Sequence, residues 1–174
     1  MNIFFLDEDP KLCAEYHCDK HVVKMILESA QIMSTVVRAH NIDAGYKATH
    51  HNHPCTLWAG DNRANYMWLY QLAGRLNDEY KFRFGRNVNH KSWDVIQSLP
   101  DPTFLPPRYS TITRPAMAMP IQYRDNDDPV KAYRNYYFYE KYDICHWQCG
   151  APDWWIEMER DMCSQPDIFI QKAP

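Results

Sequence analysis

The stretch PKLCAEYHCDKHVVKMILESAQIMSTVVRA, residues 10–39, decides the fold class. After Pro10 it contains neither glycine nor proline, the residues that most often interrupt a helix. The spacing of its apolar residues, at steps of three and four, is typical of an amphipathic helix; they are Leu12, Tyr16, Val23, Ile26, Leu27, Ala30, Met33 and Val37. Asp9 before Pro10 provides an N-cap followed by a favourable first helical residue. The pattern predicts one long helix from Pro10 to about Ala39, with a bend near Cys18.

A second long helix is predicted from Asp61, a capping residue, to Phe84, which Gly85 follows. Its expected inner face consists of Tyr66, Leu69, Leu72, Ala73, Leu76 and Tyr80. Shorter helices are predicted at 89–99, 128–142 and 153–163, and a short helical turn at 54–59. Residues 2–6 are predicted to form a short extended or buried arm.

Residues 100–127 contain six prolines and show no helical period. Apolar side chains predict an ordered loop or lid in place of a flexible linker; the expected anchors are Phe104, Leu105, Tyr109, Ile112, Met117 and Met119. The prediction for the whole chain, residues 1–174, is one compact, mostly α domain with two long helices, three shorter ones and this Pro-rich loop.

Composition narrows the class of protein. The 174 residues, 45% apolar and 24% charged, suit one globular domain. A mean hydropathy of −0.62 and the lack of a long apolar run argue against a membrane span. We find no signal peptide pattern and expect a cytoplasmic location, in which the six cysteines are thiols or metal ligands. A net charge of −3 argues against strong non-specific binding of nucleic acid but leaves a local basic face open.

The densest polar cluster is EYHCDKHVVK, residues 15–24. His17, His21 and Lys24 share one helix face at i, i+4 and i+7, and Lys20 adjoins them. Glu15 and Asp19 flank the same turn, so the cluster combines carboxylates with imidazoles and amines, as sites of proton transfer do. A solvated helix face is the alternative interpretation.

A second cluster, HHNHPC at residues 50–55, lies where a loop enters a helix. His51 and His53, together with His17 and His21, are the candidate ligands if a zinc or iron ion is bound. The spacing matches no standard zinc motif, and a helix-capping or phosphate-contacting histidine explains the cluster equally well. The sequence CHWQC, residues 145–149, indicates buried structural thiols more than a metal site.

Two segments interleave basic and aromatic residues, a pattern typical of phosphate neutralisation combined with base stacking. The first, residues 79–91, includes Arg83 and Lys91, although cations at the end of a helix also complement its dipole. The second, residues 131–142, includes Tyr133, Arg134 and Lys141.

Two resemblances follow from these motifs. Through DEDP, HNHPCTLWA, AMP and YRNYY, among others, the whole chain resembles a family of uncharacterised proteins of tailed phages, which implies an infected host cell as the location. Residues 12–85 resemble the phage pyrimidine-dimer DNA glycosylase with AP-lyase activity, of the endonuclease V type. The shared features are Ala14-Glu15-Tyr16, Gly45-Tyr46, His53-Pro54, and Glu79 with the following aromatic-Arg-Gly turn. This resemblance implies a compact α-fold that flips a nucleotide out of duplex DNA and attacks its sugar with an amine.

The sequence departs from that family at two places. A catalytic glutamate and flanking arginines follow Ala-Glu-Tyr in the family, whereas His17, Cys18 and His21 stand here and the nearest carboxylate is Asp19. The family's nucleophile is an N-terminal amine exposed when Met is removed before a small residue. Because the side chain at position 2 is a large asparagine, we expect the amine to be that of Met1 or the ε-amine of Lys20.

The leading hypothesis is an enzyme that cleaves the N-glycosidic bond of a pyrimidine base or nucleotide in a pocket between the two long helices, without a required cofactor. The expected catalytic residues are His17 and His21 as acid and base, Asp19, Lys20, His53 and Glu79. The expected phosphate and nucleic-acid contacts are Lys24, His51, Arg83, Lys91, Tyr133, Arg134 and Lys141. This hypothesis requires residues 15–24 and 50–55 to line one cavity.

Three alternatives remain at this point. The chain is a transferase in phage thymine hypermodification, a metal-dependent nucleotide hydrolase, or a factor without catalysis that binds a nucleotide or a host protein. The expected partner under the leading hypothesis is DNA or a nucleotide, and not a membrane.

Overall fold

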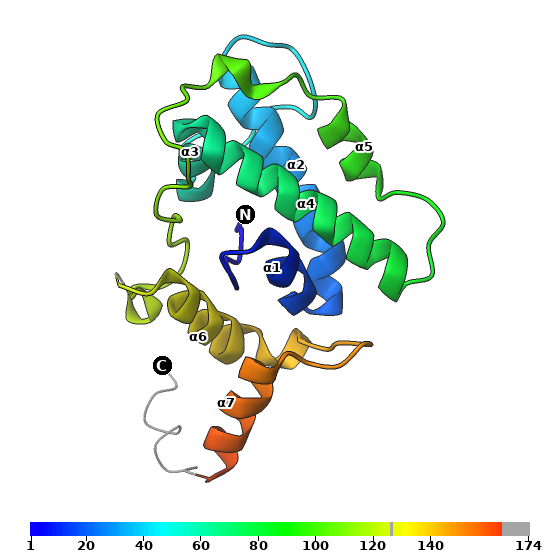
Figure 1. Cartoon of the computed structure of the whole chain (residues 1–174), viewed down its shortest axis with the longest axis vertical. Helices are drawn as coiled ribbons and strands as arrows, with labels where there is room; N and C mark the ends of the chain where they lie inside the picture. The colour runs from blue at the N-terminus through cyan, green and yellow to red at the C-terminus, as the bar shows by residue number, and fades with distance from the viewer. Residues whose placement is uncertain (126, 165–174) are drawn as a thin grey trace.

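The computed structural model describes residues 1–125 and 127–164, and within them every regular element is helical (Figure 1). The α-helices are α1 (Pro10–Tyr16), α2 (Asp19–Ala39), α3 (Pro54–Asp61), α4 (Arg63–Arg83), α5 (Lys91–Gln97), α6 (Pro129–Lys141) and α7 (Asp153–Ser164). Short 3₁₀ turns are η1 (Pro102–Phe104), η2 (Ile121–Tyr123) and η3 (Tyr142–Ile144). The mostly α prediction is confirmed.

The predicted first long helix is wrong in one respect, because it is broken into α1 and α2 instead of bent. His17 and Cys18 have extended backbone, with ψ of 135° and 160°. The Cys18 N–H, which a continuous helix would use internally, donates to Oη of Tyr137 on α6 at 3.0 Å. A tertiary hydrogen bond therefore holds the break, and the sequence periodicity alone could not indicate it.

Helices α2 and α4 pack on each other through the apolar faces that their spacing predicted. Ile26 and Met33 of α2 and Leu69, Leu72 and Leu76 of α4 are completely buried. The predicted faces are confirmed in part: Leu12 and Leu27 are exposed, and Tyr16, Val23 and Tyr80 are half-buried. The interface between the two long helices is therefore packed core.

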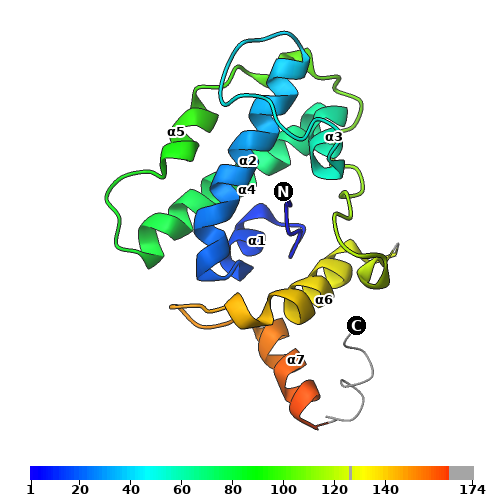
Figure 2. The ribbon, with the colours of Figure 1, turned by 180° about the vertical axis from the view of Figure 1, so that it is seen from behind.

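The predicted N-terminal arm is buried but has no strand partner among the described residues. Ile3, Phe5 and Leu6 are 2% exposed or less. Seen from behind, the chain's N-terminus lies beside α2, with α3 above it and α6 below it (Figure 2). The arm thus passes through the middle of the molecule, where it can carry the terminal amine to α2.

The Pro-rich segment runs from α5 past α3 to α6, as Figure 1 shows. Leu105 and Met119 anchor it in the core, and Phe104, Ile112 and Met117 are partly buried against it. The prediction of these anchors is confirmed for all but Tyr109, which is 54% exposed.

Helices α6 and α7 form the lower part of the molecule in Figure 1 and attach to the break between α1 and α2. The Trp147 indole N–H donates to the carbonyl of Tyr16 at 3.1 Å, and the Asp19 N–H donates to the carbonyl of His146 at 2.8 Å. No helix in the described residues is long and apolar enough to cross a membrane.

Candidate active site

The N-terminal arm is fixed on α2 by Asn2, which is 7% exposed. Its backbone N–H donates to Oε2 of Glu28 at 2.7 Å, and its side-chain amide donates to the carbonyl of Ala118 at 2.8 Å. Its Oδ1 accepts from the backbone N–H groups of Ile3 and Phe4. These contacts hold the N-terminal amine of Met1, one residue earlier, beside the Glu28 carboxylate.

Glu28 lies between this terminus and a surface cation. Its second carboxylate oxygen, Oε1, is 3.5 Å from Nζ of Lys24, one turn earlier on α2. The Glu28 side chain is 12% exposed, whereas the Lys24 side chain is 63% exposed. The carboxylate is therefore sheltered but open on the side that carries the lysine.

His53 reaches the same region from the loop before α3. Its Nδ1 accepts a hydrogen bond from the Cys55 N–H at 3.2 Å and so caps the helix. Burial lowers the pKa of His53, the positive charges of the N-terminus and His50 lower it further, and Glu28 opposes them. Because Nδ1 accepts, the ring proton of the neutral imidazole is on Nε2.

Two buried side chains, those of Cys55 and Tyr133, lie on the core side of this region. Burial raises the pKa of the Cys55 thiol to about 12, so the thiol is neutral and chemically inert. The Tyr133 hydroxyl hydrogen-bonds the Cys55 side chain and donates to the carbonyl of Ala116 at 2.5 Å. The sequence analysis expected Tyr133 to contact nucleic acid, but its side chain is completely buried in the core.

An amine, a carboxylate and a neutral imidazole are thus gathered around the N-terminus. In its unprotonated form the amine is a nucleophile, the carboxylate can stabilise a developing positive charge, and the imidazole Nε2–H can donate a hydrogen bond to a leaving group. Lys20, Lys24 and His51 are exposed, on α2 and in the loop before α3, as expected of side chains that meet a phosphate backbone.

His17 does not join this group. It is completely buried, its Nδ1 lies 2.7 Å from the carbonyl oxygen of Cys13, and its Nε2 finds no hydrogen-bond partner among the described residues. Burial lowers the pKa of His17 to about 4, so the ring is neutral at pH 7.

His21 is likewise a core residue. Its Nδ1 lies 2.7 Å from Oη of Tyr137, and the ring of Phe4 stacks on its face with 4.7 Å between centroids. The predicted convergence of His17 and His21 with His53 is not seen, because Phe4 and Tyr137 surround the first two while His53 accompanies the N-terminus.

Asp19, Glu79 and Arg83 form a buried brace between helices. The Arg83 guanidinium, with a side chain 2% exposed, donates to Glu79 Oε2 at 2.7 Å and to Asp19 Oδ1 at 3.1 Å. It also donates to the carbonyls of His17 and Glu15, each at 2.8 Å. Four of the five guanidinium N–H groups thus bond within the protein, and the buried side chain is not presented to a phosphate.

The remaining predicted phosphate contacts are dispersed. Arg134 donates to the carbonyl of Leu6 at 2.9 Å and pairs with Asp7, which makes it a second internal brace. Lys141 stacks over the ring of Tyr136, and Lys91 is exposed at the start of α5. The structure brings none of these three to the N-terminal group.

The conditional metal set is not formed. No three His, Cys, Asp or Glu side chains are arranged to hold an ion anywhere in residues 1–125 and 127–164. Within the predicted set, His17 and His21 are directed to Cys13 and Tyr137, His53 caps α3 and His51 is exposed.

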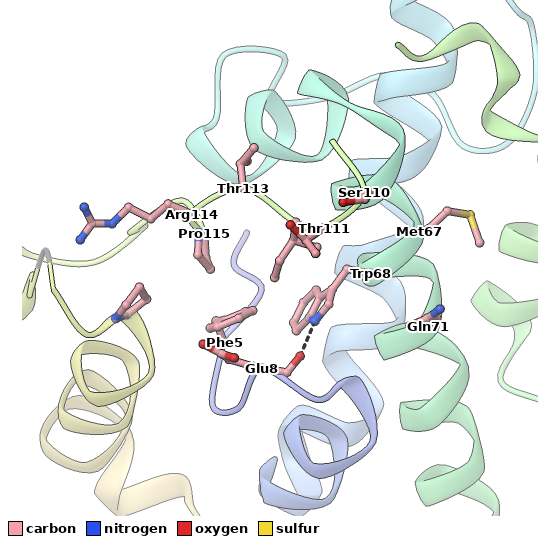
Figure 3. A pocket seen from close by; sticks show the side chains of 13 residues that line it. Phe5, Glu8, Met67, Trp68, Gln71, Ser110, Thr111, Thr113, Arg114 and Pro115 are labelled. Carbon is pink, nitrogen blue, oxygen red and sulfur yellow. Dashed lines mark hydrogen bonds between the residues drawn. The ribbon is translucent and has the colours of Figure 1, made fainter. Parts of the chain in front are cut away.

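A cavity of about 640 Å³ borders the arm at Phe5 and Glu8 (Figure 3). Trp68 and Gln71 of α4 and the segment 110–115 form its other walls. The Trp68 indole N–H donates to the carbonyl of Glu8 at 2.8 Å, which fixes one wall. This cavity lies between α4, the arm and the Pro-rich segment, and not between the two long helices as predicted. A smaller cavity does border both long helices, at Met33 and Tyr66, but none of the predicted catalytic residues lines it.

Sequence reasoning did not identify Glu28. A signal was present, because Glu28 lies four residues after Lys24 and seven after His21 and so extends their helix face. The Met1 amine was identified only through resemblance, and only folding brings the residue after it, Asn2, into contact with Glu28.

Comparison with known proteins gives one match. The model of the pyrimidine dimer DNA glycosylase family matches residues 1–94, more than half of the 174-residue chain. This range contains the arm, Glu28 and His53, and it ends before the segment 110–115 and α6. No curated protein and no solved structure matches this chain.

Proposed function

This chain belongs to the pyrimidine dimer DNA glycosylase family, and on that premise we propose that it cleaves the N-glycosidic bond of a damaged pyrimidine in DNA with the Met1 amine as nucleophile. The observation that supports this proposal is the 2.7 Å hydrogen bond from the Asn2 N–H to Glu28. It sets the terminal amine beside a sheltered carboxylate, within the part of the chain that the family model covers.

The proposed reaction begins when the unprotonated amine attacks C1′ of the deoxyribose. The N–C1′ bond forms, and the base leaves with the electron pair of the glycosidic bond. Positive charge develops on the sugar as the bond breaks, and the Glu28 carboxylate stabilises it. Opening of the sugar ring then gives an imine between the amine and C1′, the intermediate from which an AP lyase breaks the strand.

In this proposal the neutral imidazole of His53 donates a hydrogen bond from Nε2–H to the departing base and stabilises the negative charge that develops on it. Its Nδ1 accepts the α3 capping bond, so only Nε2–H is available as the donor. Burial lowers the pKa of His53, which keeps the ring in this neutral form. Lys20, Lys24 and His51 bind the backbone phosphates on the exposed side of Glu28.

The cavity beside the arm is proposed to hold the unstacked base. Phe5 and Trp68 supply aromatic surface, and Gln71 and Thr111 supply polar groups at its walls. A Gln71→Ala variant should therefore excise pyrimidine dimers more slowly but cleave a preformed abasic site at the normal rate, because that substrate has no base to bind. Equal loss on both substrates would contradict this placement.

Borohydride trapping tests the central claim. The protein is mixed with duplex DNA that carries a pyrimidine dimer, borohydride reduces the imine, and peptide mass spectrometry locates the adduct. We expect it on the Met1 peptide, on the same peptide in Lys20→Ala when the DNA concentration saturates the protein, and reduced roughly 10²-fold or more in Glu28→Gln. Glu15→Gln, a half-exposed carboxylate of the preceding helix, is the control and should trap normally.

Other outcomes would favour the alternatives. An adduct on Lys20 would overturn the assignment of the nucleophile. Tight binding of DNA or nucleotide without any adduct would favour a binding factor, and a mass increase of the base without excision would favour a transferase. Nucleotide hydrolysis that depends on an added divalent metal would favour a hydrolase.

A further inference from the structure

Two cysteines meet at the break between α1 and α2, away from the proposed nucleophile. The Asp19 N–H donates to the carbonyl of His146 at 2.8 Å, which sets the two backbones side by side. Cys18 and Cys145 each precede one member of this pair. The Cys18 sulfur is 4.0 Å from the carbonyl oxygen of Ile144, the residue before Cys145, and the two thiols are close enough to shift each other's pKa.

Two more side chains lie beside Cys18, those of His21 and Tyr137. The Tyr137 hydroxyl accepts the Cys18 N–H at 3.0 Å and lies 2.7 Å from Nδ1 of His21. The Cys145 side chain, and after it His21 and Tyr137, lower the pKa of Cys18, which burial opposes. The Cys18 side chain and burial raise the pKa of Cys145, so the shared proton is on Cys145.

From this geometry we infer that Cys18 and Cys145 form a dithiol that hydrogen peroxide oxidises reversibly to an intramolecular disulfide. A thiolate, an imidazole and a second thiol within bonding distance are the components that such a site needs. Cys145 lies outside the family match at residues 1–94, so the pair is a property of this chain and does not depend on the proposed glycosylase activity.

Oxidation of the pair takes two steps. The Cys18 thiolate attacks one peroxide oxygen, an S–O bond forms and the O–O bond breaks, which gives a sulfenic acid and hydroxide. The hydroxide takes the Cys145 proton and becomes water. The Cys145 thiolate then attacks the Cys18 sulfur, the S–S bond forms, the S–O bond breaks and a second hydroxide leaves. Two thiols are oxidised and one peroxide is reduced to two waters, once a solvent proton has neutralised that hydroxide.

The other four cysteines differ from this pair in burial and in pKa. Burial raises the pKa of both Cys13 and Cys55 to about 12, which keeps them as unreactive thiols. Cys149 and Cys163 are exposed and are free to react with other oxidised molecules. Cys18 is completely buried and Cys145 only partly, so oxidation of the pair requires peroxide to enter from the side of Cys145.

The test uses the full-length Cys149→Ser/Cys163→Ser variant, whose remaining cysteines are Cys13, Cys18, Cys55 and Cys145. After brief treatment with peroxide, the protein is unfolded, alkylated and digested. We expect the Cys18 and Cys145 peptides to be cross-linked, two fewer alkylated thiols, and full recovery with dithiothreitol. The unfolding temperature of the oxidised protein should rise by roughly 5–10 °C, since the cross-link closes a long loop.

Adding Cys145→Ser to that variant gives the matched control, and circular dichroism checks that it folds. It should show no cross-link and no peroxide-dependent shift in the unfolding temperature. Oxidation of Cys18 to sulfinic acid without a cross-link in the parent variant would overturn the inference. So would a Cys145–Cys149 disulfide as the main product in the wild-type chain.

Discussion

Arg83, at the end of α4, forms a 3.1 Å ion pair with Asp19, the first residue of α2. The same guanidinium bonds the carbonyls of Glu15 and His17, so it joins α4 to both sides of the helix break. Removing one partner of such a network leaves the others buried and uncompensated, and the cost is large.

We therefore expect Arg83→Met to destabilise the fold by about 3–5 kcal/mol. Arg75→Met on the same helix is the control, because its partner Asp78 is 57% exposed and the pair is 3.5 Å long. The control should cost less than about 1 kcal/mol. Urea unfolding of both variants measures the difference, and similar losses would show that Arg83 is not a brace.

The stability of the protein should fall with acid because of His17. The pKa of His17 is about 4 in the folded chain, whereas that of an unperturbed histidine is 6.5. Between pH 4 and pH 6.5 the unfolded state therefore binds one proton more than the folded state. The stabilisation is present above pH 6.5 and is lost as the pH falls to 4, to a total of about 3 kcal/mol.

Urea unfolding at several pH values checks this, with His17→Asn as the comparison. The asparagine amide can still donate to the Cys13 carbonyl but does not titrate. The stability difference between wild type and variant should shrink from pH 7 to pH 4. Parallel curves would mean that His17 is not buried in its neutral form.

His53 and His90 provide a matched test of capping against catalysis. Each accepts a backbone N–H at 3.2 Å and caps a short helix, α3 or α5. Asparagine is a good N-cap residue, so both His→Asn variants should keep their stability within about 1 kcal/mol. Only His53→Asn should slow base excision, by roughly 10²-fold. Equal activity of the two variants would remove His53 from the proposed site.

Alanine substitutions at Gly45 and Gly85 distinguish the stability cost of backbone strain from that of steric overlap. Both have positive φ, 69° and 57°, but a Cβ at Gly45 would lie 2.3 Å from Oγ of Ser34, whereas nothing is within 4 Å at Gly85. Gly85→Ala should cost about 1 kcal/mol from conformation alone, and Gly45→Ala clearly more. Thermal unfolding of both variants distinguishes them, and equal shifts would contradict the close contact at Ser34.

Some of the site could be predicted from the sequence. His53, Lys24 and the Met1 amine were candidates because of local motifs and resemblance, and the structure places them around one carboxylate. Arg83 and Arg134 were also candidates, since a basic residue among aromatic ones has the same sequence pattern on a surface and in a core. Arg83 is buried and Arg134 is half-buried because they bond to α1, the start of α2 and the arm, which no local pattern encodes.

What the sequence determined by itself is the helical class and nearly every helix boundary, because capping residues, glycines, prolines and apolar spacing act within a few neighbouring positions. The tertiary structure alone decided the break at Cys18 and the meeting of the N-terminus with Glu28. It also decided the pairing of Cys18 with Cys145. Each of these depends on a contact between residues more than 25 positions apart. Such a contact forms only once the buried core fixes where each helix lies.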